Sequence, residues 1–495
     1  MHPRLRAVCD LSVSGVREMA GLHEYDGQIQ DLSPDGVRAG LARLGGDPLD
    51  DPHDDAHLRA FEDGLRVALG ELELHRRDPL LHLENLELAC YDREYAPEGE
   101  RAAARQRHLA AWPQAVDMAV AALDAVSAPT AQALLGAARG LGAGVEGTDA
   151  LAAHRRLVAH LERLARDGDP DPALGGDALA RLMGVQEALD VDLGRLAERA
   201  DAERRRLQAM LAEACARIQP RRPPAELVPE LLRDHPDIDG VIDEARRQTD
   251  EVIAFTRERA LAPYVDGVCL VGPAPESRRW AMAMMCSSAP AEPDAPSWYH
   301  VTPPDPGWPR DEVAEWLSTF SRTTLPAVTV HEVAPGHFAH ARALRRVASP
   351  VRRVLFSMAF AEGWAHYIEE VCLDEGFRAD DPRFAVGVAI EALVRVTRLS
   401  CSIGLHTGAM TVDDATRRFQ DHAYLARAAA ASEARRGTFD ATYGRYTWGK
   451  LVLQDVREDA RARWDGGFSL QRFHEALLDL GSPPLGLTRA ALDGR

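Results

Sequence analysis

The chain has 495 residues, of which 46% are hydrophobic and 27% charged, and this composition excludes a disordered or collagen-like protein. The formal net charge of −19 argues against a nucleic acid or an anionic membrane as partner, and no stretch approaches 18 consecutive apolar residues, so no transmembrane helix is expected. No apolar signal core follows the N-terminus and the seven cysteines form no CxxC pair, so we expect a cytoplasmic protein with reduced thiols.

Helical patterns dominate the first half of the chain. Ser33 followed by Pro34 is typical of a helix N-terminus, because serine caps the helix and proline suits its first position. Apolar residues then recur at helical spacing through several segments that are separated by Gly- and Asp-rich breaks. The predicted helical ranges are 57–74, 101–126, 131–141, 148–166, 176–216 and 238–260.

A proline cluster at 219–224 cannot be helix interior, so it predicts a boundary between an N-terminal helical domain, 1–219, and a catalytic domain, 220–495. Two short segments, 265–271 and 298–302, are rich in β-branched or aromatic residues and are bounded by Pro and Gly, which favours strands. From 310 onward the pattern is helical again. The predicted fold is therefore mainly α, a large multi-helix architecture with a small β-sheet insert at about 262–305, next to the active site.

The segment 322–340 contains a His-Glu pair, His331-Glu332, and then His337. In the usual zinc-protease motif two histidines four residues apart share one helix face. Six residues would separate the two side chains by about 240° on an intact helix. However, Pro335 lacks an N–H and clashes with the carbonyl of His331, and Gly336 follows. The sequence therefore predicts a break in the helix that can bring His337 back toward His331.

A carboxylate lies at a suitable distance downstream. Glu362 follows His337 by 25 residues, close to the place where one large class of zinc peptidases carries its third ligand. Two histidines and a glutamate leave the fourth zinc position open, which is the catalytic arrangement. Glu332 would then be the general base. Two histidines and a carboxylate also bind iron in non-haem oxygenases, but an oxygenase needs no base beside its ligands.

Further motifs carry a resemblance. His331-Glu332…Pro335-Gly336-His337 followed by Glu362-Gly363-Trp364-Ala365, together with segments 398–406, 446–450, 457–460 and 473–485, resembles the bacterial family named domain of unknown function 885. The resemblance covers essentially the whole chain. It implies a fold like that of all-α zinc carboxypeptidases and oligopeptidases, with His331, His337 and Glu362 as metal ligands and Glu332 as base. The family pattern has other residues where this chain has Phe338, His340 and Ser402.

Other residues are candidates for substrate contact or catalysis. By resemblance, His406 belongs to the site and would stabilise the oxyanion. Tyr446, Lys450 (the single lysine) and Arg457 share one predicted helix face and would bind a substrate carboxylate or polarise a carbonyl. His340 and His366 lie on the faces of His337 and Glu362, and Tyr299 and His300 lie in a predicted edge strand that would align a substrate. The alternative for each is an ordinary packed or solvated side chain; Glu369 and Glu370 are predicted to be solvated.

These patterns together favour a zinc-dependent metallohydrolase that cleaves a peptide or other amide bond in a small substrate. One Zn²⁺ is expected, although another divalent transition metal fits the same ligands. Two alternatives remain open at this point. The first is a catalytically altered helical binding protein, suggested by Phe338, His340 and Ser402. The second is a metal-dependent biosynthetic enzyme that uses the same ligand set for another reaction.

Overall fold

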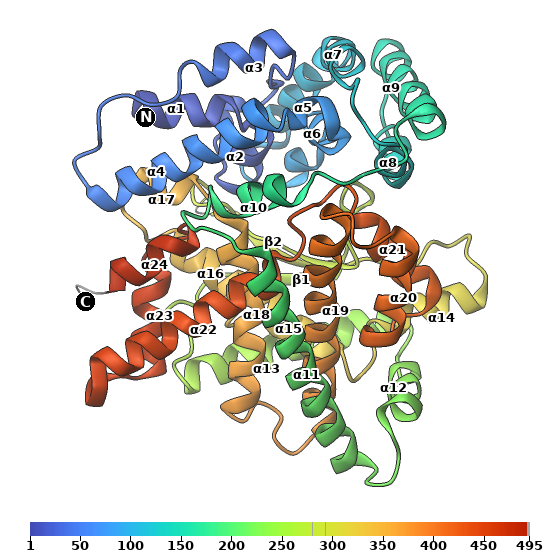
Figure 1. The fold of residues 1–495 in the computed structure, drawn as a ribbon, viewed down its shortest axis with the longest axis vertical. Helices are drawn as coiled ribbons and strands as arrows, with labels where there is room; N and C mark the ends of the chain where they lie inside the picture. The colour runs from blue at the N-terminus through green and yellow to red at the C-terminus, as the bar shows by residue number, and fades with distance from the viewer. Residues whose placement is uncertain (280, 293, 493–495) are drawn as a thin grey trace.

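The computed structural model describes residues 1–279, 281–292 and 294–492. It consists mainly of helices, so the predicted fold class is confirmed (Figure 1). The N-terminal helices gather on one side of the molecule, at the top of Figure 1. They are α1 (Pro3–Asp10), α2 (Val13–Met19), α3 (Pro34–Leu41), α4 (Pro52–Leu65), α5 (Leu74–Arg77), α6 (Pro79–Glu84), α7 (Glu98–Ala122), α8 (Ala128–Gly140) and α9 (Thr148–Asp167).

The remaining helices form the larger body below them in Figure 1. Before the sheet come α10 (Gly176–Gly184), α11 (Leu193–Ile218), α12 (Pro224–Arg233) and α13 (Ile238–Glu258). After the sheet come α14 (Arg310–Ser318), α15 (Leu325–Glu332), α16 (His337–Leu344), α17 (Pro350–Val354), α18 (Met358–Asp374), α19 (Pro382–His406), α20 (Val412–Ala423), α21 (Arg427–Arg436), α22 (Arg445–Trp464), α23 (Leu470–Leu478) and α24 (Leu485–Leu492). None of the helices in the described ranges is long and apolar enough to span a membrane.

Local sequence signals explain most helix ends. Ser33 caps α3, and its hydroxyl accepts a hydrogen bond from the Gly36 N–H at 3.0 Å, as predicted. The single helix predicted over 176–216 is two helices, α10 and α11, because the chain turns after Gly184 and Asp192 caps a new helix by accepting from the Arg195 N–H. A side chain at position 184 would collide with the Leu189 carbonyl at 2.3 Å.

The small sheet has three strands in the order β1-β3-β2 and lies within the predicted insert. Strand β1 (Cys269–Pro273) pairs in parallel with β3 (Ser297–Val301), and β2 (Ala283–Cys286) pairs with β3 antiparallel. The sequence predicted β1 a few residues too early and did not predict β2. Because β3 is paired on both sides, the expectation that 298–302 forms an edge strand is wrong.

One hydrophobic core surrounds the helices that carry the predicted ligands. It runs from Leu179 in α10 to Leu492 in α24 and includes Leu207 and Leu211 of α11. Helix α11 packs along α19, and α15 contacts α13, α18 and α19. The predicted domain boundary at residue 219 remains a prediction, and this core extends across it.

Helices α18 and α22 approach unusually closely. A Cβ atom placed on Gly363 would lie 2.6 Å from the Gly449 Cα, and one on Gly449 would lie 2.1 Å from the Ala359 carbonyl oxygen. Only glycine at both positions permits this crossing without displacement of the backbone. The crossing is adjacent to Glu362, so it sets the position of the predicted carboxylate ligand.

Candidate metal centre

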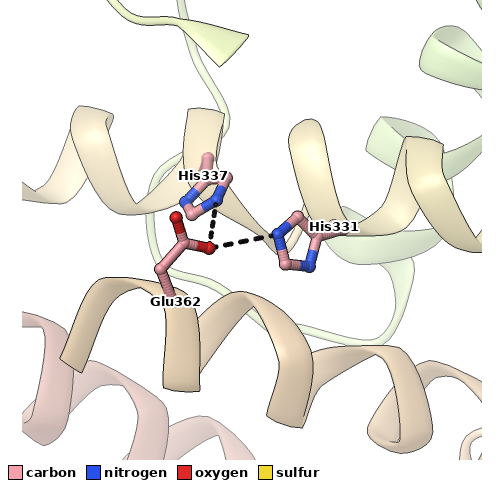
Figure 2. A group of neighbouring side chains, drawn as sticks. All are labelled: His331, His337 and Glu362. Atoms are coloured by element: carbon pink, nitrogen blue, oxygen red, sulfur yellow. Dashed lines mark ion pairs between the residues drawn. The ribbon is translucent and has the colours of Figure 1, made fainter. Parts of the chain in front are cut away.

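His331 and His337 lie on either side of a break between two helices (Figure 2). Helix α15 ends at Glu332 and α16 begins at His337. At the break Gly336 comes so close to the preceding turn that a Cβ atom there would lie 1.9 Å from the His331 carbonyl oxygen. The two imidazole rings are consequently neighbours, with centroids 4.8 Å apart and planes at 89°. The predicted convergence of the histidines across Pro335-Gly336 is confirmed.

Glu362 extends from α18 toward both rings (Figure 2). Its Oε2 atom lies 3.4 Å from Nε2 of His331 and 3.4 Å from Nε2 of His337. Three donors that bind one tetrahedral zinc at about 2.1 Å are separated by about 3.4 Å. One donor atom from each residue lies within 4.8 Å of the other two. The donor types and their spacing therefore fit a zinc ion.

A second observation supports the same conclusion. Oε2 of Glu362 is buried and has no hydrogen-bond partner, although a buried carboxylate oxygen normally has one. Burial raises the pKa of Glu362, but the neighbouring His337 and His331 outweigh it and hold that pKa well below its usual range. An ionised, buried carboxylate oxygen facing two imidazole nitrogens is a suitable ligand for a divalent cation.

The other nitrogen of His331 is held by a residue that the sequence did not identify. Nδ1 of His331 lies 2.7 Å from Oε1 of Glu369, which is fully buried. Arg395 of α19 donates to the second oxygen of Glu369 at 3.0 Å. This arrangement, in which a carboxylate accepts the N–H of a ligand histidine, orients the ring and increases its basicity. The prediction that Glu369 and Glu370 are solvated is wrong; Glu369 lies two helical turns after Glu362, on the same face of α18, and that spacing was the available signal.

Glu332 directly follows His331 in the chain. Its side chain is buried. Burial raises the pKa of Tyr299 in β3 and of Cys269 in β1, and the nearby negative charge of Glu332 raises both pKa values further. Among the described residues no hydrogen bond or ion pair holds its carboxylate. Such a group is free to accept a proton from a water molecule.

Tyr446 lies in the first turn of α22, next to His331. Its ring stacks 6.3 Å from that of His331 at 25°. Burial first, and then the negative charge of Glu362, raise the pKa of its hydroxyl. That hydroxyl has no partner in the described part of the chain and is not sealed from solvent. It is therefore a free, protonated donor beside the candidate metal ligands.

Comparison with known proteins agrees with the motifs. Residues 16–492 match the bacterial family described as "Bacterial protein of unknown function (DUF885)". The chain belongs to the DUF885 family. No curated protein matches it.

Two solved structures resemble this DUF885 protein over nearly their entire length. One is a candidate lipoprotein of unknown function from Shewanella oneidensis, with 20% identity, a TM-score of 0.77, and coverage of 98% of this chain and 97% of the other. The second is a candidate lipoprotein from Colwellia psychrerythraea, with 17% identity, a TM-score of 0.78, and coverage of 99% and 97%. At this level of identity the likeness establishes the fold.

Three of the predicted histidines lie outside the group formed by His331, His337 and Glu362. His340 is buried, and its Nε2 donates to the Gly481 carbonyl at 3.0 Å. His406 is buried at the end of α19 and binds backbone with both nitrogens: Nε2 donates to Gly437 at 2.9 Å and Nδ1 accepts from Leu174 at 3.4 Å. These bonds leave His406 no free donor for an oxyanion, so its placement does not suit the predicted catalytic role. His366 is fully buried with Nδ1 3.5 Å from Glu369.

The predicted substrate-binding residues of the sheet are also packed. Tyr299 is fully buried, and its hydroxyl lies 3.5 Å from the Thr329 hydroxyl of α15. His300 is buried and stacks on Trp298, with ring centroids 5.4 Å apart. Since β3 has no free edge, neither its backbone nor these side chains are placed to align a substrate. The strand instead supports α15, which carries His331.

Lys450 and Arg457 of α22 contact other residues than the candidate metal ligands. Lys450 is 0% exposed; its amine donates to Glu203 of α11 at 2.7 Å and also to Glu370 of α18. No free cation is left there to bind a substrate carboxylate, so the predicted role of Lys450 does not fit its position. Arg457 stacks over Tyr367 at 5.4 Å and donates to its hydroxyl at 3.4 Å. Of the predicted face, Tyr446 alone lies beside the ligands.

Proposed function

We propose that this DUF885 protein is a zinc-dependent hydrolase that cleaves a peptide or other amide bond in a small substrate. The observation that carries the proposal is the buried Oε2 of Glu362, which has no hydrogen-bond partner and lies 3.4 Å from Nε2 of both His331 and His337. An uncommitted carboxylate, Glu332, directly follows the first of these ligands in the chain. A hydrolytic zinc site needs both components, a set of metal ligands and a general base.

The zinc ion, when bound by His331, His337 and Glu362, would supply Lewis acidity that activates water and polarises a carbonyl. Glu332 accepts a proton from the attacking water, whose oxygen forms a bond to the carbonyl carbon of the substrate. The carbon–nitrogen bond then breaks, and Glu332 returns the proton to the leaving nitrogen. The free Tyr446 hydroxyl donates a hydrogen bond to the oxygen on which negative charge develops.

Glu332→Gln tests the proposal directly. Removal of the base should reduce kcat by about 10²- to 10⁴-fold, while zinc content measured by mass spectrometry stays near one equivalent. Glu315→Gln, an exposed carboxylate on α14, is the matched control and should change neither quantity. The proposal fails if purified protein neither holds nor accepts a transition metal. It also fails if metal-loaded protein turns over no member of a peptide and acyl-amide library.

The expected location is cytoplasmic, and we include it in the proposal. All seven cysteines lack disulfides, and six of them are buried, as expected for a reducing compartment. The two similar solved structures are both named as candidate lipoproteins, which points to a cell envelope for those proteins. Fractionation of the native host with an antibody to this chain decides between the two: recovery in the membrane fraction would refute the cytoplasmic location.

A further inference from the structure

Two arginine side chains lie next to Tyr446, beyond the metal ligands. The Arg398 guanidinium carbon of α19 is 5.2 Å from the centre of the Tyr446 ring, and that ring in turn stacks on His331. Arg436, the last residue of α21, is an electrostatic neighbour of both Arg398 and Tyr446. These two positive groups therefore lie on the side of the site that Tyr446 occupies.

Each guanidinium is held along one edge and free along the other. Arg398 donates Nε and Nη2 to Glu433 at 2.7 and 2.8 Å. Arg436 donates Nε and Nη2 to Asp440 at 3.2 and 3.0 Å. Nη1 of each arginine has no hydrogen-bond partner among the described residues. Neither Nη1 is among the fully buried side-chain atoms that lack a hydrogen bond. The two side chains keep 14% and 32% of their surface exposed, so each can donate an N–H to a ligand that approaches from solvent beside Tyr446.

The free donors match one kind of chemical group. A carboxylate has two acceptor oxygens and a negative charge, and arginine is the residue that binds it with the best geometry. One extended amino-acid residue spans about 3.5 Å, and a charge-assisted hydrogen bond adds about 2.8 Å. Arg398 and His331 both contact the Tyr446 ring, so a substrate carboxylate that extends past Tyr446 by about one residue would approach Arg398.

We propose that Arg398 and Arg436 bind a free α-carboxylate on the leaving side of the substrate, one residue beyond the bond that is cleaved. This inference rests on the proposed hydrolytic function and narrows the substrate class to peptides cleaved at their C-terminal residue and to N-acyl amino acids. A substrate whose terminal carboxylate is an amide loses both the charge and the second acceptor oxygen that the two guanidiniums bind.

The experiment compares N-acyl dipeptides that carry a free C-terminal carboxylate with the same dipeptides as C-terminal amides. With zinc-loaded protein, kcat/KM for the free acid should exceed that for the amide by about 10- to 100-fold, the range expected for charge-assisted hydrogen bonds. Arg436→Gln should remove most of this preference, and Arg436→Lys should restore part of it. Asp440 keeps Arg445 as its partner in these variants.

Arg435→Gln is the matched control, because Arg435 is the exposed neighbour of Arg436 on α21, and it should leave the preference unchanged. The double variant Arg398→Gln/Glu433→Gln tests the second arginine without leaving a carboxylate unpaired. Circular dichroism and zinc content verify that each variant is folded and loaded.

Binding separates this inference from the proposed function. Calorimetry with Glu332→Gln, loaded with zinc, measures the affinity for the free acid and for the amide without turnover. A preference for the acid that disappears in Glu332→Gln/Arg436→Gln supports the carboxylate subsite even if wild-type protein cleaves neither compound. Equal cleavage or equal binding of acid and amide overturns the subsite, while cleavage itself leaves the hydrolase proposal intact.

Discussion

His331 and Glu369 form a buried imidazole–carboxylate pair, with Nδ1 2.7 Å from Oε1. This bond assigns the nitrogens of His331: Nδ1 carries the proton that Glu369 accepts, and Nε2 faces Glu362. Burial raises the pKa of Glu369, but Arg395, His366 and His331 together outweigh it and hold that pKa below its usual range, so the acceptor remains charged. The pair thus orients one candidate metal ligand from the nitrogen opposite to the one that faces Glu362.

Glu369→Gln should weaken zinc binding by about 10- to 100-fold, as expected when the carboxylate partner of a ligand histidine is lost. Competition with a chromophoric chelator measures the affinity. Asp374→Asn, an exposed acid at the end of the same helix, is the control. If the affinity of Glu369→Gln stays within about two-fold of wild type, the orienting role of Glu369 is refuted.

The buried His474 predicts a pH effect on stability. Burial lowers its pKa to about 4, whereas the unfolded chain has an ordinary histidine pKa of about 6.5. The unfolded state therefore takes up a proton first, and the stabilising contribution of His474, present above pH 6.5, is lost as the pH falls toward 4. Urea unfolding of wild type and His474→Gln should show a stability difference that shrinks by about 3 kcal/mol over this window.

The same two proteins provide the control for this prediction. Between pH 8 and 9 His474 is almost entirely neutral in both states, so the difference in free energy of unfolding should be constant. A difference that is also constant from pH 6.5 to 4 would show that His474 is not held neutral by the fold. Glutamine is suitable because its amide can still donate to the Leu261 carbonyl, which His474 Nδ1 contacts at 2.8 Å.

Lys450→Met should reduce the free energy of unfolding by about 3–5 kcal/mol, because it removes one partner of a buried ion pair. Glu203 and Glu370 would keep only Arg206, which donates to both. Arg461→Met, an exposed cation on the same helix, should change stability by less than about 0.5 kcal/mol. A raised KM with unchanged stability would instead indicate that Lys450 contacts the substrate.

Gly363→Ala should both destabilise the protein and weaken metal binding. The added methyl group would lie 2.6 Å from the Gly449 backbone, so α18 must shift away from α22 and carry Glu362 with it. We expect a loss of about 1–3 kcal/mol, as for other overpacked positions, together with lower zinc affinity. Gly136→Ala, a helical glycine with open space around it, should be neutral or stabilising. Unchanged zinc affinity in Gly363→Ala would mean that the crossing does not set the position of Glu362.

The sequence was sufficient to predict that His331 and His337 converge, because the break between them is local. Pro335 and Gly336 lie between His331 and His337, and their backbone restrictions alone imply a broken helix. Glu362 follows His337 by 25 residues and lies in α18, the second helix after α16. The mainly α fold was predictable for the same reason, since helical periodicity and caps are read over short windows.

Features that depend on distant partners were not predictable in this way. Glu369 looks like a solvated surface acid until α15 and α19 bring His331 and Arg395 to it. Lys450 binds Glu203, which is 247 residues away in the sequence, so no local sequence pattern predicts that contact. Strand β2 has few β-branched residues, so the sequence did not predict that it forms a strand. Its pairing with β3 was therefore not expected, and β3 was predicted to be an edge strand.

The span between Glu203 and Lys450 also has a consequence for biosynthesis. A ribosome synthesises Glu203, the candidate ligands and Glu370 well before it adds Lys450, so until then Arg206 is the one cation of this group that can pair with the two acids. Until α22 emerges, the nascent chain contains every candidate zinc ligand but lacks the helix that crosses α18 beside Glu362. Stable capture of the metal is therefore expected only after α22, Arg445–Trp464, has left the exit tunnel.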